Sequence, residues 1–573
     1  MDVIGINLRI DPKPNGRIYL SIGHGYRDQN KKSKSITIKS LGYVDELISQ
    51  YPDPIAHFRE EVKKMNIEAA EKKEAEIVYF DKTIKLQSGA TEKNVGYAAL
   101  SKIYHELDLD KFFASRQRGK KVEYNINSIM KLLTYSRILA PGSKKKAYER
   151  RNWFFDKMDF SLDDVYRSLT LIQKMSDALQ VWIHERILTN YGRDTTFAYY
   201  DVTNYHFEID DEDDNLRKGV SKNHRPDPIV QMGLLIDNNN VPLSFDLFPG
   251  NLNDCKTLLP ILKNVRQKFN IGKMVIVADK GMNTGSNAYY IANGRGWYIF
   301  SQTVRGGTKE LKKFVLDNTG YTNVGTGYKM KSRQFTRCVE IEQEEGLPPI
   351  KAEISEKQVV FYSEKYNKKA KQDREKAIQK AQAIVKDPTK FKKYNTHGAA
   401  KYIENLEYDA ETGEIINTKS KIFFNIKKLE EDELYDGYYL IVTNCFDKPD
   451  EWAVEKYHGL WQIEDAFKVT KSDLEARPVN VRLWDHIQAH FLICFVALTI
   501  IRLLQNRLLG KHYSTKIIES LSRACCAHID TNRYMSYYYD DVLDDIGKSL
   551  GIDFSTKFMK LSDIRKLLGD TKK

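Results

Sequence analysis

Residues 273–281 read Lys273-Met-Val-Ile-Val-Ala-Asp279-Lys-Gly281, and this stretch decides the fold. Its first six residues form an almost continuous apolar run, as do strands that are buried on both faces of a parallel sheet. The run ends on a carboxylate, Asp279. Upstream, Thr196–Val202 is a second apolar strand that ends on Asp201-Val-Thr. The sequence therefore predicts two strands that each end on an aspartate, one at Asp201 and one at Asp279.

The region around these strands alternates between strand and helix signals. Asp237-Asn-Asn-Asn240 is a hairpin turn signal, and Asp254 is available to cap the helix that follows. The remaining expected elements are strands at Ile229–Ile236, Val241–Phe248 and Gly296–Thr303 and helices at Asp254–Phe269 and Asn283–Asn293. The order β-β-β-α-β-α-β is that of an α/β, ribonuclease-H-like core. In that fold the first and fourth strands are neighbours, so Asp201 and Asp279 should project from one sheet edge.

The patterns of apolar and charged residues divide the rest of the chain into further regions. Two alternating runs, Arg17–Ile22 and Ser35–Leu41, predict a β-hairpin with a basic loop, and a charged helix should follow at 54–75. We expect the hairpin and connector helix in 1–75 and a mainly helical, DNA-binding region in 76–190. The core should be divided into a first part, 191–304, and a second part, 449–510, with a β-rich insertion domain between them in 305–448. We expect a helical C-terminal region for dimerisation in 511–573.

Composition narrows the class of protein. The 573 residues carry 90 Lys and Arg against 78 Asp and Glu, a net charge of +12 that favours a polyanionic partner. The six cysteines form no CxxC pair, so neither a zinc ribbon nor a dithiol redox motif is indicated, and unpaired cysteines suit a reducing cytosol. We expect no signal peptide. The most apolar stretch, Phe491–Leu504, is too short to span a bilayer and predicts a buried helix, hence no membrane partner.

A third acid lies on a later helix. Tyr457, Glu464 and Lys471 are seven residues apart, about two helical turns each, so they should share one face. A half-buried Glu464 needs a compensating partner. Three carboxylates, Asp201, Asp279 and Glu464, can hold two Mg²⁺ ions, with Mn²⁺ as a substitute, and Asp201 bridging. Lys471 and Tyr457 would then contact phosphate oxygens.

Each candidate also has a plainer interpretation. A lone aspartate at a strand end is usually a turn or cap residue, and Glu464 could pair with Lys468 one turn away. The basic cluster Lys144, Lys145 and Lys146 could contact phosphates or simply solvate a helix end. His224 with Arg225 could bind DNA or cap the next strand. The acidic run Asp210–Asp214 predicts a solvated loop rather than a metal site.

Taken together, the motifs resemble the DDE transposases of bacterial insertion sequences, in the insertion-sequence-four superfamily with its Y-R-E-K signature. The spacing of Tyr457, Glu464 and Lys471 matches that signature, while Leu460 stands where the signature has arginine. Further matching stretches are Ala278-Asp279-Lys-Gly, the loop with Asn283 and Ser286, Lys222–Asp227, Pro249–Asp254 and Leu474–Pro478.

The resemblance implies a function. A transposase of this kind binds the terminal inverted repeats of its element, cuts the DNA with metal and joins the freed end to target DNA. It acts as a homodimer, in the bacterial cytoplasm at the nucleoid. DNA contacts are expected from Tyr457, Lys468, Lys471, His224, Arg225 and Lys144–Lys146, and the insertion would hold a hairpin or flipped base. Two alternatives remain: a transposase relic that only binds DNA, and a structure-selective nuclease.

Overall fold

The computed structural model describes residues 3–27, 33–71, 92–207, 228–269, 271–341, 348–386, 400–408, 415–530 and 532–573. The chain forms two compact units, Met1–Gly89 and Ala90–Lys573. The boundary between them lies after Gly89, whereas we predicted the first boundary after residue 75. His224, Arg225 and the acidic run Asp210–Asp214 lie outside the described residues.

The N-terminal unit is a three-stranded antiparallel sheet with two helices. Its elements are β1 (Val3–Pro12), β2 (Ile18–Arg27), β3 (Ser33–Tyr43), α1 (Val44–Leu47) and α2 (Pro54–Glu71). The predicted hairpin is β2–β3, but the prediction missed β1. Its signal was present, because Ile6, Leu8 and Ile10 alternate with polar residues as in a half-buried strand.

The second unit is built on a sheet that, in the described residues, has the order β10-β11-β12-β15-β9-β8-β5-β6-β7. Its core elements follow the predicted sequence β-β-β-α-β-α-β. They are β5 (Phe197–His206), β6 (Ile229–Asp237), β7 (Pro242–Pro249), α9 (Leu258–Lys268), β8 (Val275–Ala278), α10 (Gly285–Asn293) and β9 (Trp297–Gln302). The three strands β5, β8 and β9 are parallel, and the hairpin strands β6 and β7 are antiparallel. The cap at residues 254–256 is the side chain of Asn253, not that of Asp254.

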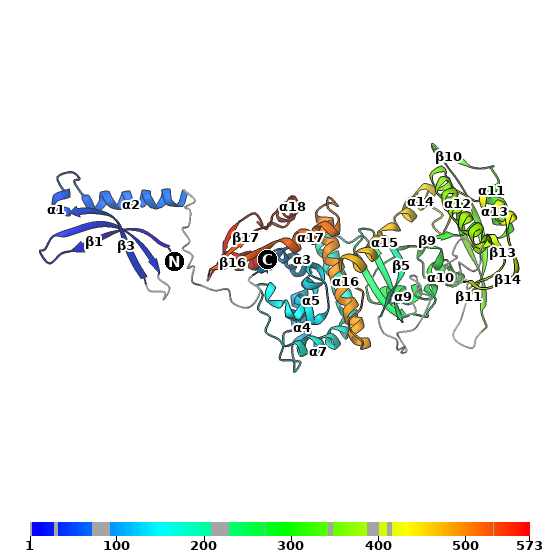
Figure 1. The fold of residues 1–573 in the computed structure, drawn as a ribbon, viewed down its shortest axis with the longest axis horizontal. Coiled ribbons are helices and arrows are strands. Elements are labelled where there is room, and N and C mark those ends of the chain that lie inside the picture. Colours follow the sequence, from blue (N-terminus) through cyan, green and yellow to red (C-terminus); the bar gives the residue numbers. More distant parts are fainter. Residues whose placement is uncertain are drawn as a thin grey trace. The chain divides into compact units, whose positions relative to one another are not determined.

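Side chains alternate across this sheet and separate two cores. Tyr200 and Ala278 belong to the core under α9 and α10. Tyr199 and Val277 face the opposite core, where α15 (Trp461–Lys468) and α16 (Trp484–Arg507) pack. As predicted, α16 is a core helix: it is apolar enough to span a membrane, yet 94% of its most apolar window is buried within the structure. Figure 1 shows α15 and α16 beside the core strands.

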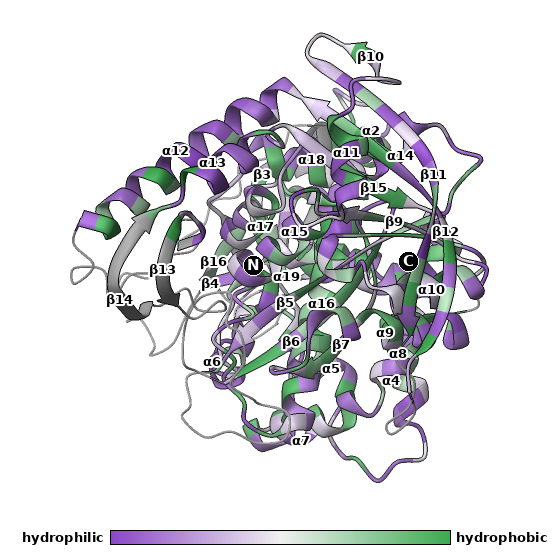
Figure 2. Ribbon diagram, turned by 90° about the vertical axis from the view of Figure 1, so that its right-hand side faces the viewer, coloured by the Kyte–Doolittle hydropathy of each residue, from purple (hydrophilic) through white to green (hydrophobic). Residues whose placement is uncertain are grey.

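Residues 305–448 were predicted as an insertion domain, and their strands extend the sheet of the core. The strand β15 (Tyr438–Thr443) pairs with β9, and β12 (Ile350–Ser363) pairs with β15. The other elements are α11 (Lys309–Leu316), β10 (Thr322–Gly325), β11 (Tyr328–Ile341), α12 (Glu364–Lys386), β13 (Ile403–Tyr408), β14 (Ile415–Phe424) and α13 (Ile426–Glu433). In Figure 2, α12 is drawn mostly in the purple of hydrophilic residues.

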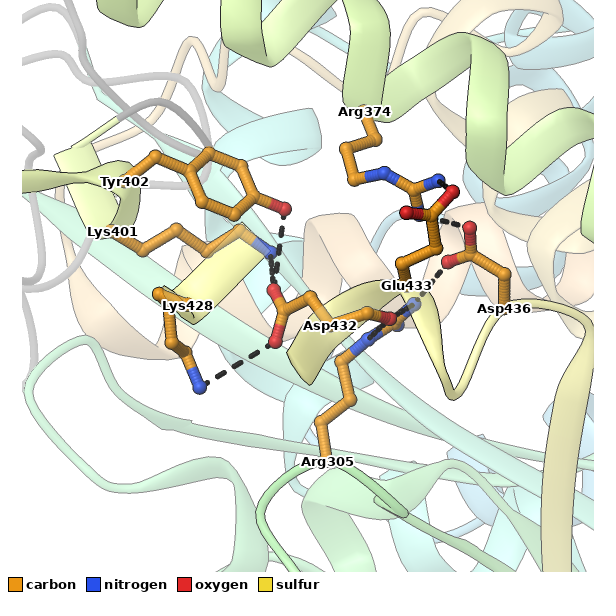
Figure 3. A network of polar contacts seen from close by, with 8 residues as sticks. All are labelled: Arg305, Arg374, Lys401, Tyr402, Lys428, Asp432, Glu433 and Asp436. Carbon is orange, nitrogen blue, oxygen red and sulfur yellow. Dashed lines mark hydrogen bonds and ion pairs between the residues drawn. The ribbon is translucent and has the colours of Figure 1, made fainter. Parts of the chain in front are cut away.

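A network of ion pairs fixes α13 and the turn after it (Figure 3). The carboxylate of Asp436 accepts from Arg374 of α12 and, at 2.7 Å, from Arg305. Asp432 pairs with Lys401 at 2.7 Å and also accepts from the hydroxyl of Tyr402. Both aspartates are only 4% exposed, so the network compensates charges that would otherwise be costly to bury.

The rest of this unit consists of the helices that precede β5, the tail that follows α16, and a second sheet. As predicted, residues 95–190 are helical: α3 (Tyr97–Glu106), α4 (Leu109–Gln117), α5 (Ile126–Leu139), α6 (Lys144–Glu149), α7 (Leu162–Gln173) and α8 (Ser176–Tyr191). The tail contributes α17 (Ser514–Arg523), β16 (Cys525–Asp530), β17 (Arg533–Ser536), α18 (Asp541–Leu550), β18 (Phe558–Lys560) and α19 (Leu561–Asp570).

The described residues of the tail, which we predicted as helical, form three helices and also three strands that we did not predict. Strand β16 pairs with β4 (Glu92–Asn94), and β17 and β18 complete this sheet. Helices α17, α18 and α19 contact α3, and α17 also contacts α5. The tail therefore buries the apolar faces of its helices within its own chain.

Candidate active site

Two aspartates lie side by side at the centre of the sheet. In the parallel pairing of β5 with β8, Tyr200 is opposite Ala278, so Asp201 and Asp279 are the next residues on neighbouring strands. Alternation puts both carboxylates on the face that α15 covers, since Tyr199 and Val277 belong to that core. The prediction that Asp201 ends its strand is wrong, because the antiparallel pairing with β6 carries β5 on to His206.

Two hydroxyl groups hold the Asp279 carboxylate. Its Oδ1 accepts hydrogen bonds from Ser301 Oγ at 2.9 Å and from Tyr457 Oη at 3.2 Å. Burial raises the pKa of Tyr457, and the charge of Asp279 adds to this, so the phenol stays protonated and remains a donor. Ser301 was not among the residues predicted for the site. The signal lay in the register, because Phe300 pairs with Ala278 and so Ser301 follows beside Asp279.

Glu464 lies on α15, but the single straight helix that we predicted around it is interrupted. Helix α14 (Asp450–His458) contains Tyr457, α15 contains Glu464, and a π-helical turn (Val469–Asp473) contains Lys471. Gly459, between α14 and α15, lies against Tyr199 so closely that a Cβ atom there would be 2.3 Å from the Tyr199 hydroxyl.

The face of α15 that packs on β5 and β6 is apolar. Ile463, Ala466 and Phe467 are buried there, and Glu464 is exposed. Among the described ion pairs Glu464 has none with Lys468, so the plainer interpretation of Glu464 gains no support. Trp461, one turn before Glu464, is 61% exposed and was not among the residues predicted for the site.

Lys471 brings a cation to the same face of β5. Its ammonium donates to the hydroxyl of Thr203 and lies 5.4 Å from the centre of the Tyr205 ring. Thr203 is two residues after Asp201, so both project from one side of the strand. The π-helical turn directs Lys471 toward the sheet, and such turns are frequent at functional sites.

The side chains offer the right donors for Mg²⁺, but not yet a closed site. Carboxylate oxygens are the ligands that Mg²⁺ prefers, and among the described contacts Asp279 Oδ2 accepts no hydrogen bond. However, within the described part of the chain no three Asp, Glu, His or Cys side chains are close enough together to hold a metal ion. The sheet places Asp201 and Asp279 on adjacent strands, and among the described residues Glu464 does not form a three-ligand cluster with them.

The lysines predicted to contact DNA differ in their exposure to solvent. Lys144 is 3% exposed, with Nζ 2.5 Å from Nδ1 of His490, and burial lowers its pKa to about 7. Its ammonium is packed between α6 and α16, so Lys144 presents no exposed cation in this structure. Lys145, Lys146 and Lys468 are exposed.

Two family models of transposases match parts of this chain. The family model described as "Transposase DDE domain" matches residues 207–500, a range that includes Asp279 and Glu464 and begins after Asp201. The model described as "IS1634 family transposase, N-terminal domain" matches residues 8–76. No curated protein matches. Among solved structures, a piggyBac transposase synaptic complex with hairpin DNA matches at 8% identity and a TM-score of 0.35, covering 83% of this chain and 84% of that one.

Proposed function

Because this chain belongs to the family of transposases with a DDE domain, we propose that it excises and inserts an insertion sequence by cut-and-paste transposition. It binds the terminal inverted repeats, cleaves the strands at the element ends and joins them to target DNA. The two family matches support a transposase, and the Y-R-E-K spacing supports a place in the insertion-sequence-four superfamily.

One observation carries the proposal: Asp201 and Asp279 lie on adjacent parallel strands and face α15, the helix with Glu464. The strand order β7-β6-β5-β8-β9 supports a ribonuclease-H-like core. A ligand-free enzyme need not hold its third acid in place, because catalytic contacts often tighten only when substrate binds. DNA at the exposed face of α15 would bring Glu464 to the two aspartates.

The residues of the site have distinct roles in this mechanism. Asp201, Asp279 and Glu464 would hold two Mg²⁺ ions, with Mn²⁺ as a substitute, and these would supply an activated oxygen nucleophile and stabilise the leaving oxygen. Ser301 and Tyr457 fix the rotamer of Asp279 and leave its Oδ2 available, as hydrogen bonds to metal-ligating carboxylates do. Lys471 neutralises the phosphate beside the scissile bond.

The partners are duplex DNA and a second copy of the chain. A homodimer would pair two element ends, so that cleavage waits for both. Exposed Lys145, Lys146 and Lys468 contribute phosphate contacts, which release counterions and make the affinity fall steeply with salt.

Excision of the native element from a plasmid tests the proposal. The wild type should excise the element with Mg²⁺ and lose activity when the metal is chelated. Glu464→Gln should abolish excision, and Glu451→Gln, an exposed acid on α14, should not. Excision by Glu464→Gln would show that another residue is the third acid. Binding without cleavage would favour a DNA-binding relic, and cleavage without joining a nuclease.

A further inference from the structure

The N-terminal unit has one face of its sheet covered and one face open. Leu20 and Ile22 of β2 are fully buried, and Phe58 and Val62 of α2 are buried with them. On the opposite face, Asn7 and Thr37 are exposed. The register places Arg9 opposite Ser21 and Thr37 opposite Gly23, so this face alternates with the buried one.

In the N-terminal unit, the sheet has an excess of basic residues and the two helices have an excess of acidic residues. The strands β1–β3 and the turn between β1 and β2 have a single acid, Asp11, against six basic residues: Arg9, Lys13, Arg17, Arg27, Lys34 and Lys39. Helices α1 and α2 have the reverse, with three basic residues and six acids: Asp45, Glu46, Glu60, Glu61, Glu68 and Glu71. The sheet therefore suits a polyanion and the helices repel one.

Arg9 lies across the open face without an acidic partner. Its guanidinium covers Gly23, where a Cβ atom would be 2.4 Å from Nε, and Nη1 donates to Thr37 Oγ1 at 3.4 Å. Arg9 Nη2 is buried and finds no hydrogen-bond partner among the described residues. An unsatisfied buried donor of this kind is costly, so turning the guanidinium outward to an acceptor on a ligand would gain free energy. Lys13 likewise has no described ion pair, whereas Arg17 pairs with Asp45 and Lys39 with Glu61.

We infer that this open face, with Asn7, Arg9, Tyr19 and Thr37 and the single acid Asp11, is a DNA-reading surface that enters the major groove of the element ends. The inference rests on the proposed function and adds a recognition surface apart from the active site. Three strands span about 10 Å, and the major groove is about 12 Å wide and admits β-ribbons. Arginine, asparagine and threonine are side chains that read base edges there.

Recognition of the terminal repeats would then lie in the N-terminal unit and not in the helical region that follows it. We predicted that the helical region 76–190 binds the terminal repeats. Its helices α3, α5 and α7, however, are packed against α16 or the tail, and Lys144 of its basic cluster is buried. The N-terminal unit is compact in itself and is matched by its own family model over residues 8–76.

Binding of the full chain to two duplexes tests this surface. One duplex has the terminal inverted repeat, and the other has a scrambled sequence of the same composition. Arg9→Ala should weaken binding to the repeat by about tenfold and erase the preference for it. Arg59→Ala is the matched control, since it removes the same charge from the exposed side of α2, and it should bind as the wild type does.

Arg9→Lys separates recognition from misfolding. This variant keeps the charge but lacks the fork that pairs with guanine. It should bind the scrambled duplex as well as the wild type while losing the preference for the repeat, whereas an unfolded unit would lose both. If Arg9→Ala and Arg9→Lys discriminate like the wild type, the inference is overturned and the proposed function stands. If the wild type cleaves with metal but does not prefer the repeat, the inference alone falls; if it neither binds nor cleaves, both fall.

Discussion

At the scale of single residues, hydroxyl and ammonium groups prepare the site rather than complete it. Asp279 is held by Ser301 and Tyr457 through the same oxygen, and Lys471 is held on Thr203. These contacts fix side-chain orientation before any metal or DNA is bound. Preorganised ligands lower the cost of assembling a reactive geometry, so their loss should affect the rate more than stability.

Tyr457→Phe tests this role. The variant loses the hydrogen bond to a carboxylate at 3.2 Å, and we expect single-turnover DNA cleavage to slow by about tenfold to a hundredfold, the range for a bond to a charged group. The melting temperature should change little. Tyr290→Phe on α10 is the control, because Tyr290 is 45% exposed. Equal rates for Tyr457→Phe and the wild type would remove Tyr457 from the site.

Lys144 should make stability depend on pH. Burial lowers its pKa from 10.5 to about 7, so between these values the unfolded chain binds a proton that the folded chain does not. Wild-type stability should therefore rise with pH above 7, by up to about 1.4 kcal/mol per pH unit from this group. Lys144→Met removes that slope. Urea unfolding of both proteins from pH 7 to 9 measures it, and parallel curves would contradict the assignment.

At the scale of elements, the junction between α14 and α15 decides where Glu464 lies. Gly459 permits the close approach of its backbone to Tyr199, on the same face of β5 as Asp201. Helix α15 then packs on β5 and β6 through Ile463, Ala466 and Phe467. A small shift of the junction would move Glu464 relative to both aspartates.

Gly459→Ala should therefore impair cleavage more than it impairs folding. The added Cβ meets the Tyr199 hydroxyl at 2.3 Å, so one of the two elements must move. Tyr199→Phe in the same chain removes that oxygen and should restore part of the rate. A double-mutant cycle on cleavage rate and on unfolding free energy measures this coupling. Additive effects of the two substitutions would show that the junction does not position Glu464.

At the scale of the whole molecule, strands from segments far apart in the sequence pair with each other to form the sheets. Strand β4, near residue 92, pairs with β16 of the tail, and Asn94 donates to the Leu521 carbonyl at 2.8 Å. Strand β15 joins residues 305–448 to the core through β9. The N-terminal unit, by contrast, is compact in itself.

Truncation should reveal this difference. A chain ending at residue 510 loses β16–β18 and α17–α19, exposes the faces of α3 and α5 that they cover, and should not fold. A chain beginning at residue 90 keeps the whole second unit and should melt cooperatively. Circular dichroism during heating compares the two. A cooperative transition for residues 1–510 would show that the tail is not part of this core.

The sequence by itself determined the order of elements in the core, the strands of Asp201 and Asp279 and the burial of α16. These features depend on local periodicity and turn chemistry, which act between residues near one another in the chain. Tertiary structure alone decided that residues 305–448 continue the sheet, that the tail contains strands, that Lys144 is buried and that Ser301 and Tyr457 bind Asp279. Each of these depends on which distant surfaces meet, and a one-dimensional pattern does not encode that pairing.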